Sequence, residues 1–144
     1  MTISTMHRSA PRTSTRIRLA VLAASGLLVL AVFQLALALG APLGAAAYGG
    51  THTELPTGLR ITSAVAVVVY CFAALALLRR GGYRVPIVGA RVARVTTWVF
   101  AVILPLGALM NFASSGAWER FGWGPFALAL GIVCYLVARS QTKS

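Results

Sequence analysis

The sequence predicts an all-α polytopic membrane protein with four transmembrane helices in two hairpins. Hydrophobic residues make up 58% of the 144 residues and charged residues only 10%, against roughly 25% charged residues in soluble proteins. Four apolar segments each approach the roughly 20 residues that a helix needs to cross about 30 Å of hydrocarbon. These segments span residues 17–39, 61–78, 95–113 and 122–138. A backbone in lipid must satisfy its own hydrogen bonds, so segments of this length rich in Ala, Leu and Val are expected to be helices.

The domain organisation follows from these segments. Residues 1–16 form a basic tail, residues 17–139 a single membrane domain, and residues 140–144 a second short tail. The first apolar segment could instead belong to a signal peptide, because "TSTRIRL" is a basic flank and Ala36-Leu37-Ala38 resembles a cleavage site. Its apolar stretch is longer than the roughly 7–15 residues of a signal core, which favours a retained helix.

The positions of the basic residues predict the orientation. Eleven of the thirteen lie on one side of the predicted membrane, in the two tails and the middle loop: Arg8, Arg12, Arg16, Arg18, Arg79, Arg80, Arg84, Arg91, Arg94, Arg139 and Lys143. Only Arg60 and Arg120 lie on the other side. Because short cytoplasmic loops collect Lys and Arg, both termini are expected in the cytoplasm of a multi-pass cell-membrane protein. The net charge of +11 then indicates attraction to anionic inner-leaflet lipids rather than to nucleic acid.

Small and amide residues indicate how the helices pack. Gly40 and Gly44 are four residues apart in "GAPLG", so they would share one face if the first helix continued through them, allowing a close helix contact. Gln34 and Asn111 are amides at membrane depth and are expected to form hydrogen bonds between helices, because an unpaired amide in hydrocarbon is costly.

A weak internal repeat adds Gly107 to these packing positions. At an offset of 67 residues, "VFQLALALGAPLGAAAYGG" and "VFAVILPLGALMNFASSGA" match at eight of nineteen positions, with Gly40 opposite Gly107. A duplicated hairpin would explain the matches. Coincidence in a sequence rich in Ala and Leu also remains open.

The outer loops hold the residues from which a site could be built. "THTELP" places His52 near Glu54, and Glu119 lies in the other outer loop; imidazole and carboxylate groups could bind a divalent metal or transfer protons. The favoured interpretation is a pair of solvated, charge-balanced loops, with Glu54 near Arg60 and Glu119 beside Arg120, so no metal site is predicted. "GAAAYGG" lacks the lysine of a phosphate loop. His7 and His52 lie on opposite sides of the membrane, which argues against a haem with two histidine ligands, and no cofactor is predicted.

Aromatic residues before the fourth segment are typical of a membrane interface. In "WERFGWGPF", Trp118, Phe121 and Trp123 surround a charged pair, a pattern that predicts interfacial anchors. The two cysteines, Cys71 and Cys134, have no metal-site spacing and are expected to pack as small buried residues.

The stretch "LALGAPLGAAAYGG", followed by "LPTGLRI" and a helix that ends in two arginines, resembles small uncharacterised four-helix integral membrane proteins of the bacterial inner membrane. The resemblance implies the topology and no activity. The favoured function is therefore a non-enzymatic accessory or assembly subunit, in contact with lipid, a membrane protein partner or further copies of itself. A small oligomeric transporter or channel is the alternative, and a membrane enzyme that uses the outer-loop histidine and glutamates comes third.

Overall fold

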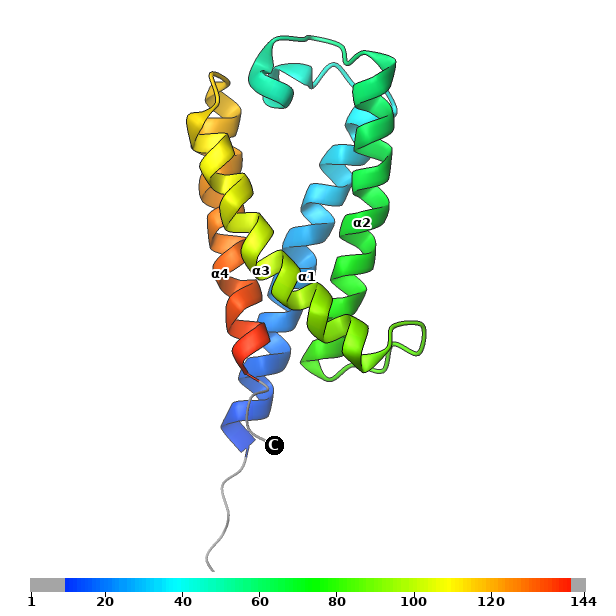
Figure 1. The fold of residues 1–144 in the computed structure, drawn as a ribbon, viewed down its shortest axis with the longest axis vertical. Helices are drawn as coiled ribbons and strands as arrows, with labels where there is room; N and C mark the ends of the chain where they lie inside the picture. Colours follow the sequence, from blue (N-terminus) through cyan, green and yellow to red (C-terminus); the bar gives the residue numbers. More distant parts are fainter. Residues whose placement is uncertain (1–9, 141–144) are drawn as a thin grey trace, which may run out of the picture.

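The computed structural model describes residues 10–140, which are almost entirely helical (Figure 1). Four long α-helices occur in this part of the chain: α1 (Ala10–Ala38), α2 (Thr57–Gly81), α3 (Ala90–Ala113) and α4 (Gly124–Arg139), the last entered through a π-helical turn at Glu119–Trp123. No strand occurs among residues 10–140. All four helices are long and apolar enough to cross a membrane. The predicted all-α fold with four membrane helices is therefore confirmed.

The helices extend beyond the predicted apolar segments at the end of the molecule where the arginines gather. α2 continues to Gly81 and α3 begins at Ala90, so the basic flanks of both segments are helical. A helix needs no apolar side chains once it leaves the hydrocarbon, and hydropathy alone therefore underestimates its length. We call this end of the molecule, which carries Arg16, Arg80 and Arg94, the arginine end, and the opposite end, which carries both acids, the glutamate end.

The helices are arranged as two pairs that diverge toward the glutamate end. α1 packs along α2 and α3 along α4, with fewer contacts between the pairs. Figure 1 shows α3 crossing in front of α1 to reach α2 near the arginine end, whereas at the other end the two pairs stand apart. Residues 40–56, which we call the roof, bend across the top of this space and include two short 3₁₀ turns.

Each helix presents a seam of residues spaced alternately four and three apart, the spacing that lines one helix face. Toward the arginine end the seams are apolar and buried, and form the main core with Leu27, Leu77, Phe100, Leu104, Leu130, Cys134 and Val137. Many of the remaining core residues are alanines, which let the helices approach closely. The core therefore joins all four helices at one end only.

Glycine provides the closest contact between α3 and α4. A Cβ atom added at Gly131 would lie 2.6 Å from Cδ of Pro105, so only glycine leaves room for the proline ring. Similarly, the Cβ of Ala20 in α1 fills the space where a side chain at Gly81 would stand. These glycines, rather than the ones predicted from sequence, allow the helices to pack closely.

Candidate functional site

The roof contains a tight turn at Tyr48, Gly49 and Gly50, all of which have positive φ angles, of 51°, 83° and 69°. Glycine adopts this conformation readily, but a tyrosine seldom does. Residues held in such rare conformations are concentrated at functional sites, where their surroundings enforce the geometry. The turn directs the Gly49 backbone toward the α3–α4 pair.

Glu119 connects this turn to the α3–α4 pair. Its two carboxylate oxygens accept hydrogen bonds from the Gly49 N–H at 3.1 and 3.0 Å, and one of them also accepts from the Ser114 hydroxyl. The Ser115 hydroxyl donates to the Gly49 carbonyl at 3.2 Å. Glu119 is only 9% exposed, so the carboxylate is largely removed from water and its hydrogen bonds to the loop replace that solvation.

Two aromatic side chains extend the connection into the helices. The Trp123 indole N–H donates to the Ala46 carbonyl at 3.0 Å, and the Trp123 ring lies 4.5 Å from the ring of Phe33 in α1. The Tyr48 hydroxyl is 3.0 Å from the hydroxyl of Ser63 in α2, which is fully buried. The roof therefore contacts both helix pairs and joins them at the glutamate end.

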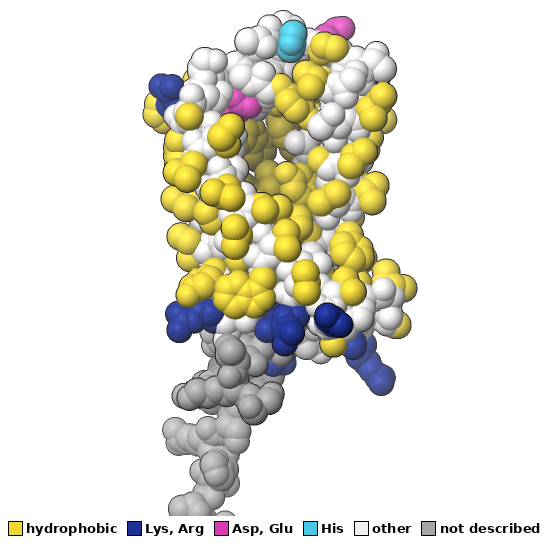
Figure 2. All heavy atoms as spheres, in the orientation of Figure 1, with side chains coloured by type: hydrophobic (Ala, Val, Ile, Leu, Met, Phe, Trp, Pro, Cys, Tyr) yellow, Lys and Arg dark blue, Asp and Glu magenta, His cyan; other side chains and the backbone are white. Residues whose placement is uncertain are grey.

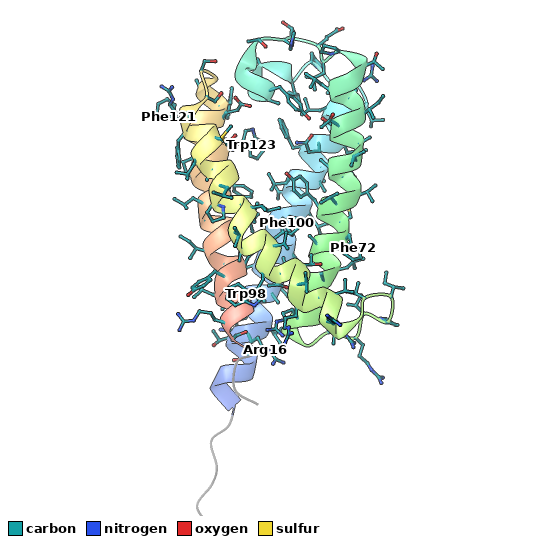
Figure 3. All side chains as sticks on the ribbon, viewed as in Figure 1. Arg16, Phe72, Trp98, Phe100, Phe121 and Trp123 are labelled. Carbon is teal, nitrogen blue, oxygen red and sulfur yellow. The ribbon has the colours of Figure 1, made fainter. Side chains whose placement is uncertain are left out.

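A hollow lies below the roof, between α2 and α3. Figure 2 shows it as an opening in the face of the molecule, lined largely by hydrophobic side chains. Phe100 and Trp123 both point into the space between the helix pairs (Figure 3), and Phe100 packs edge-on against Tyr70 of α2. We call this hollow, bounded by Tyr70 and Phe100 below and by Tyr48 above, the lateral cleft. It opens sideways, toward the lipid that would surround the helices.

The seams become more polar where they reach the cleft. Continuing them toward the glutamate end gives Gln34 on α1, Ser63 on α2 and Asn111 on α3, so three helices direct a hydrogen-bonding residue toward the same space. The side-chain amide oxygen of Gln34 is buried and has no hydrogen-bond partner in the structure. An unsatisfied buried acceptor costs stability. Gln34 therefore retains hydrogen-bonding capacity that the described part of the chain does not use.

The candidate cluster of His52, Glu54 and Glu119, the less favoured interpretation of the outer loops, is not assembled. His52 and Glu54 are exposed, whereas Glu119 is buried under the roof. Within the part of the chain that the structure describes, no three His, Cys, Asp or Glu residues lie close enough to hold a metal ion. The outer loops do meet, but through the backbone of Gly49 rather than through the two polar side chains of "THTELP".

The partners of the two outer arginines also differ from those that the charge-balanced interpretation expected. Arg60 donates from Nε to the Ala38 carbonyl at 3.0 Å, and Arg120 donates to the Ser114 carbonyl at 2.8 Å. Both bonds satisfy carbonyl groups at or just beyond the carboxyl ends of helices, where such groups have no partner within the helix and attract cations. These arginines therefore stabilise helix ends instead of neutralising the nearby acids.

The glycines predicted to pack helices have other roles. α1 ends at Ala38; Gly40 follows with a φ of 90° and lies against the Arg60 guanidinium. Gly44 is buried against the His52 carbonyl and Leu55, inside the roof. At Gly107 an added Cβ would meet no described atom within 4 Å. Gly40 thus ends a helix whereas Gly107 lies inside one, so the two copies of the sequence repeat differ in conformation here.

Only two of the three aromatic residues predicted as interfacial anchors are exposed in the structure. Trp118 and Phe121 are 66% and 76% exposed, as an anchor requires. Trp123 instead turns inward to the Ala46 carbonyl and Phe33. Residues two apart in a helical turn point in nearly opposite directions, so Phe121 and Trp123 of this turn face different sides.

Sequence reasoning did not identify Tyr48, Ser63 or Ser114. In the sequence Tyr48 looks like any aromatic residue of a loop, because its left-handed backbone conformation cannot be deduced from the sequence. Ser63 had a usable signal, since it lies seven residues before Tyr70 on one face of its helix. Both cysteines are unpaired thiols, with Cys134 buried in the core and Cys71 half-buried.

Comparison with known proteins finds no family model, no curated protein and no solved structure that matches this chain.

Proposed function

We propose that this chain is a non-enzymatic accessory or assembly subunit of the cell membrane, and that its lateral cleft receives a transmembrane helix of a partner protein. The proposal rests chiefly on one observation: the helix pairs are joined at both ends yet stand apart between them, leaving a cleft that opens toward lipid. A partner helix could enter sideways without passing the roof.

The walls of the cleft suit a helix. Gly107 lies on the same face of α3 as Phe100 and Asn111, and an added Cβ would meet no described atom within 4 Å. Small residues on a helix face allow another backbone to approach closely. The side-chain oxygen of Gln34 lacks a partner, and if this side chain turned into the cleft it could accept a hydrogen bond from a Ser, Thr, Asn or Gln of the incoming helix. Such bonds between membrane helices contribute roughly 0.6 to 2 kcal/mol each.

A small oligomeric transporter or channel is the second candidate, favoured by the polar seam residues of three helices, which are typical of pathways within membranes. Below the cleft, however, Phe100 and Leu104 are buried in the core that joins all four helices. A pathway through one chain would have to separate this packed layer. A pathway between several copies would leave the layer intact.

Photo-crosslinking in native membranes tests the proposal. A benzoylphenylalanine at position 107 faces the cleft, and one at Val102, which is 56% exposed on the opposite side of α3, serves as the control. We expect position 107 alone to yield a defined adduct whose crosslinked peptide is a transmembrane segment of another protein. Adducts only with lipid would refute the proposal. Adducts only with a second copy of this chain would favour the oligomeric alternative.

We also propose that both termini and the arginine end face the cytoplasm, because this placement puts eleven of the thirteen basic residues on that side.

A further inference from the structure

Arginine side chains surround a pocket at the arginine end, between the end of α2 and the start of α3. The pocket has a volume of about 520 Å³ and is lined by Arg80, Ala90, Arg91 and Arg94. A smaller hollow beside it is lined by Arg79, Arg80, Ala90 and Ala93. Figure 2 shows most basic side chains gathered at this end of the molecule. The end of α2 and the start of α3 thus form one concave surface.

No acidic side chain lies at this end of the molecule. The only two in the sequence, Glu54 and Glu119, lie at the opposite end. Grouping exposed arginines such as Arg91 and Arg94 without a nearby acidic side chain is unfavourable, and the cost is largest at the edge of a membrane, where lipid excludes part of the screening solvent.

Some of these arginines have a structural role that explains their presence. Arg16 donates to the Gly81 carbonyl at 3.2 Å and Arg80 to the Ala138 carbonyl at 3.1 Å, so both satisfy carbonyl groups near the carboxyl ends of helices. Arg91 and Arg94 are exposed. Their position on the rim of the pocket therefore calls for a different explanation.

Arg91 and Arg94 lie at the end of α3 that disfavours cations. No side chain caps the first turn of this helix, and that turn contains no acid. The first N–H groups of a helix lack partners within it, and the helix dipole places positive charge there. Two arginines add to this charge. An anion in the pocket would meet the N–H groups, the dipole and the guanidinium groups together.

We propose that this pocket binds a phosphate group, and that in the cell the phosphate belongs to the headgroup of an anionic phospholipid. Guanidinium groups form paired hydrogen bonds with phosphate oxygens. The pocket lies at the end of the membrane helices, at headgroup level. The adjoining loop exposes Tyr83 and Ile87, 45% and 79% exposed, which suit insertion among lipids. This proposal does not depend on the function proposed for the cleft.

Lipid binding by the purified full-length chain tests the proposal. Native mass spectrometry and thermal melting would compare phosphatidylglycerol, phosphatidylcholine and inorganic phosphate. The test variant is Arg91→Gln with Arg94→Gln. The control is Arg18→Gln with Arg84→Gln, which removes the same charge from the same end, at exposed positions outside the pocket. We expect phosphatidylglycerol binding to weaken roughly 30-fold in the test variant and at most a few-fold in the control.

Each other outcome overturns part of the proposal. Equal weakening in both variants would show general attraction between charges and no site. Equal stabilisation of the wild type by inorganic phosphate would show a phosphate site that is not lipid-specific. If the glutamine variant does not fold, Arg91→Lys with Arg94→Lys keeps the charge but removes the paired geometry; unchanged binding in that variant would exclude phosphate recognition by these guanidinium groups.

Discussion

At the residue scale, Glu119 is the residue whose environment depends most on the rest of the chain. It bonds to the backbone of Gly49, 70 residues earlier in the sequence, and is buried where the two outer loops meet. The sequence showed an acid beside an arginine and indicated a solvated pair. It could not show that Arg120 would bond to a carbonyl instead, because that choice depends on where α3 ends.

Glu119→Gln is expected to destabilise the protein by about 1.5–3 kcal/mol, the usual value of a hydrogen bond to a charged group. The amide retains one oxygen acceptor but replaces the other with a donor that faces N–H and hydroxyl donors. Thermal and urea unfolding in detergent would measure the change.

Glu54→Gln is the matched control, because Glu54 is an exposed acid in the other outer loop; it should change stability by no more than roughly 0.5 kcal/mol. Equal effects of the two substitutions would mean that the bonds between Glu119 and Gly49 contribute nothing to stability.

At the element scale, the contact between α3 and α4 depends on Gly131. Gly131→Leu would drive a side chain into the Pro105 ring and should destabilise the protein by about 1–3 kcal/mol or prevent folding. Gly107→Leu enlarges a residue of the neighbouring helix toward open space and should leave the melting temperature within about 2 °C of wild type. A large loss at Gly107 with none at Gly131 would contradict the helix packing described above.

The helices themselves could be predicted because hydrophobic length determines them almost alone. Their contacts could not, since Gly40, Gly107 and Gly131 look alike in a sequence. A glycine allows close packing only if its face of the helix meets another element, and that depends on the crossing of the pairs. Gly131 was not singled out, whereas Gly107 was chosen through a repeat whose two copies have different conformations.

At the scale of the whole molecule, orientation is the property most open to direct measurement. Reporter fusions after residues 50, 86, 118 and 144 should report outside, inside, outside and inside, because short loops rich in arginine are usually retained in the cytoplasm and we propose this orientation. A carboxyl terminus outside the cell, or cleavage near Ala38 that removes α1, would contradict this topology.

The fold class and the number of membrane helices followed from composition and segment length, whereas the lateral cleft did not. The seam of each helix can be traced in the sequence. Only the divergence of the two helix pairs shows that the apolar half of each seam is packed in the core, whereas the polar half faces the open cleft. Gln34 and Asn111 were predicted to form hydrogen bonds between helices, whereas the side-chain oxygen of Gln34 has no partner in the structure. The space that they share results from the positions of all four helices.

The bond between Gly49 and Glu119 also fixes an order of events during synthesis. The roof leaves the ribosome with α1 and α2, when Glu119, Ser115 and Trp123 have not yet been translated. Its left-handed turn then has the contact between Tyr48 and Ser63 of α2 but none of its bonds to the second half of the chain. Until α3 and α4 have been synthesised, the roof of the first half therefore lacks its contacts to the second half. A chain that stops after residue 86 should insert both helices yet be cut by proteinase K within residues 40–56 from the outside, whereas the full chain should resist. Completion of the last helix would then be the step that protects the first loop.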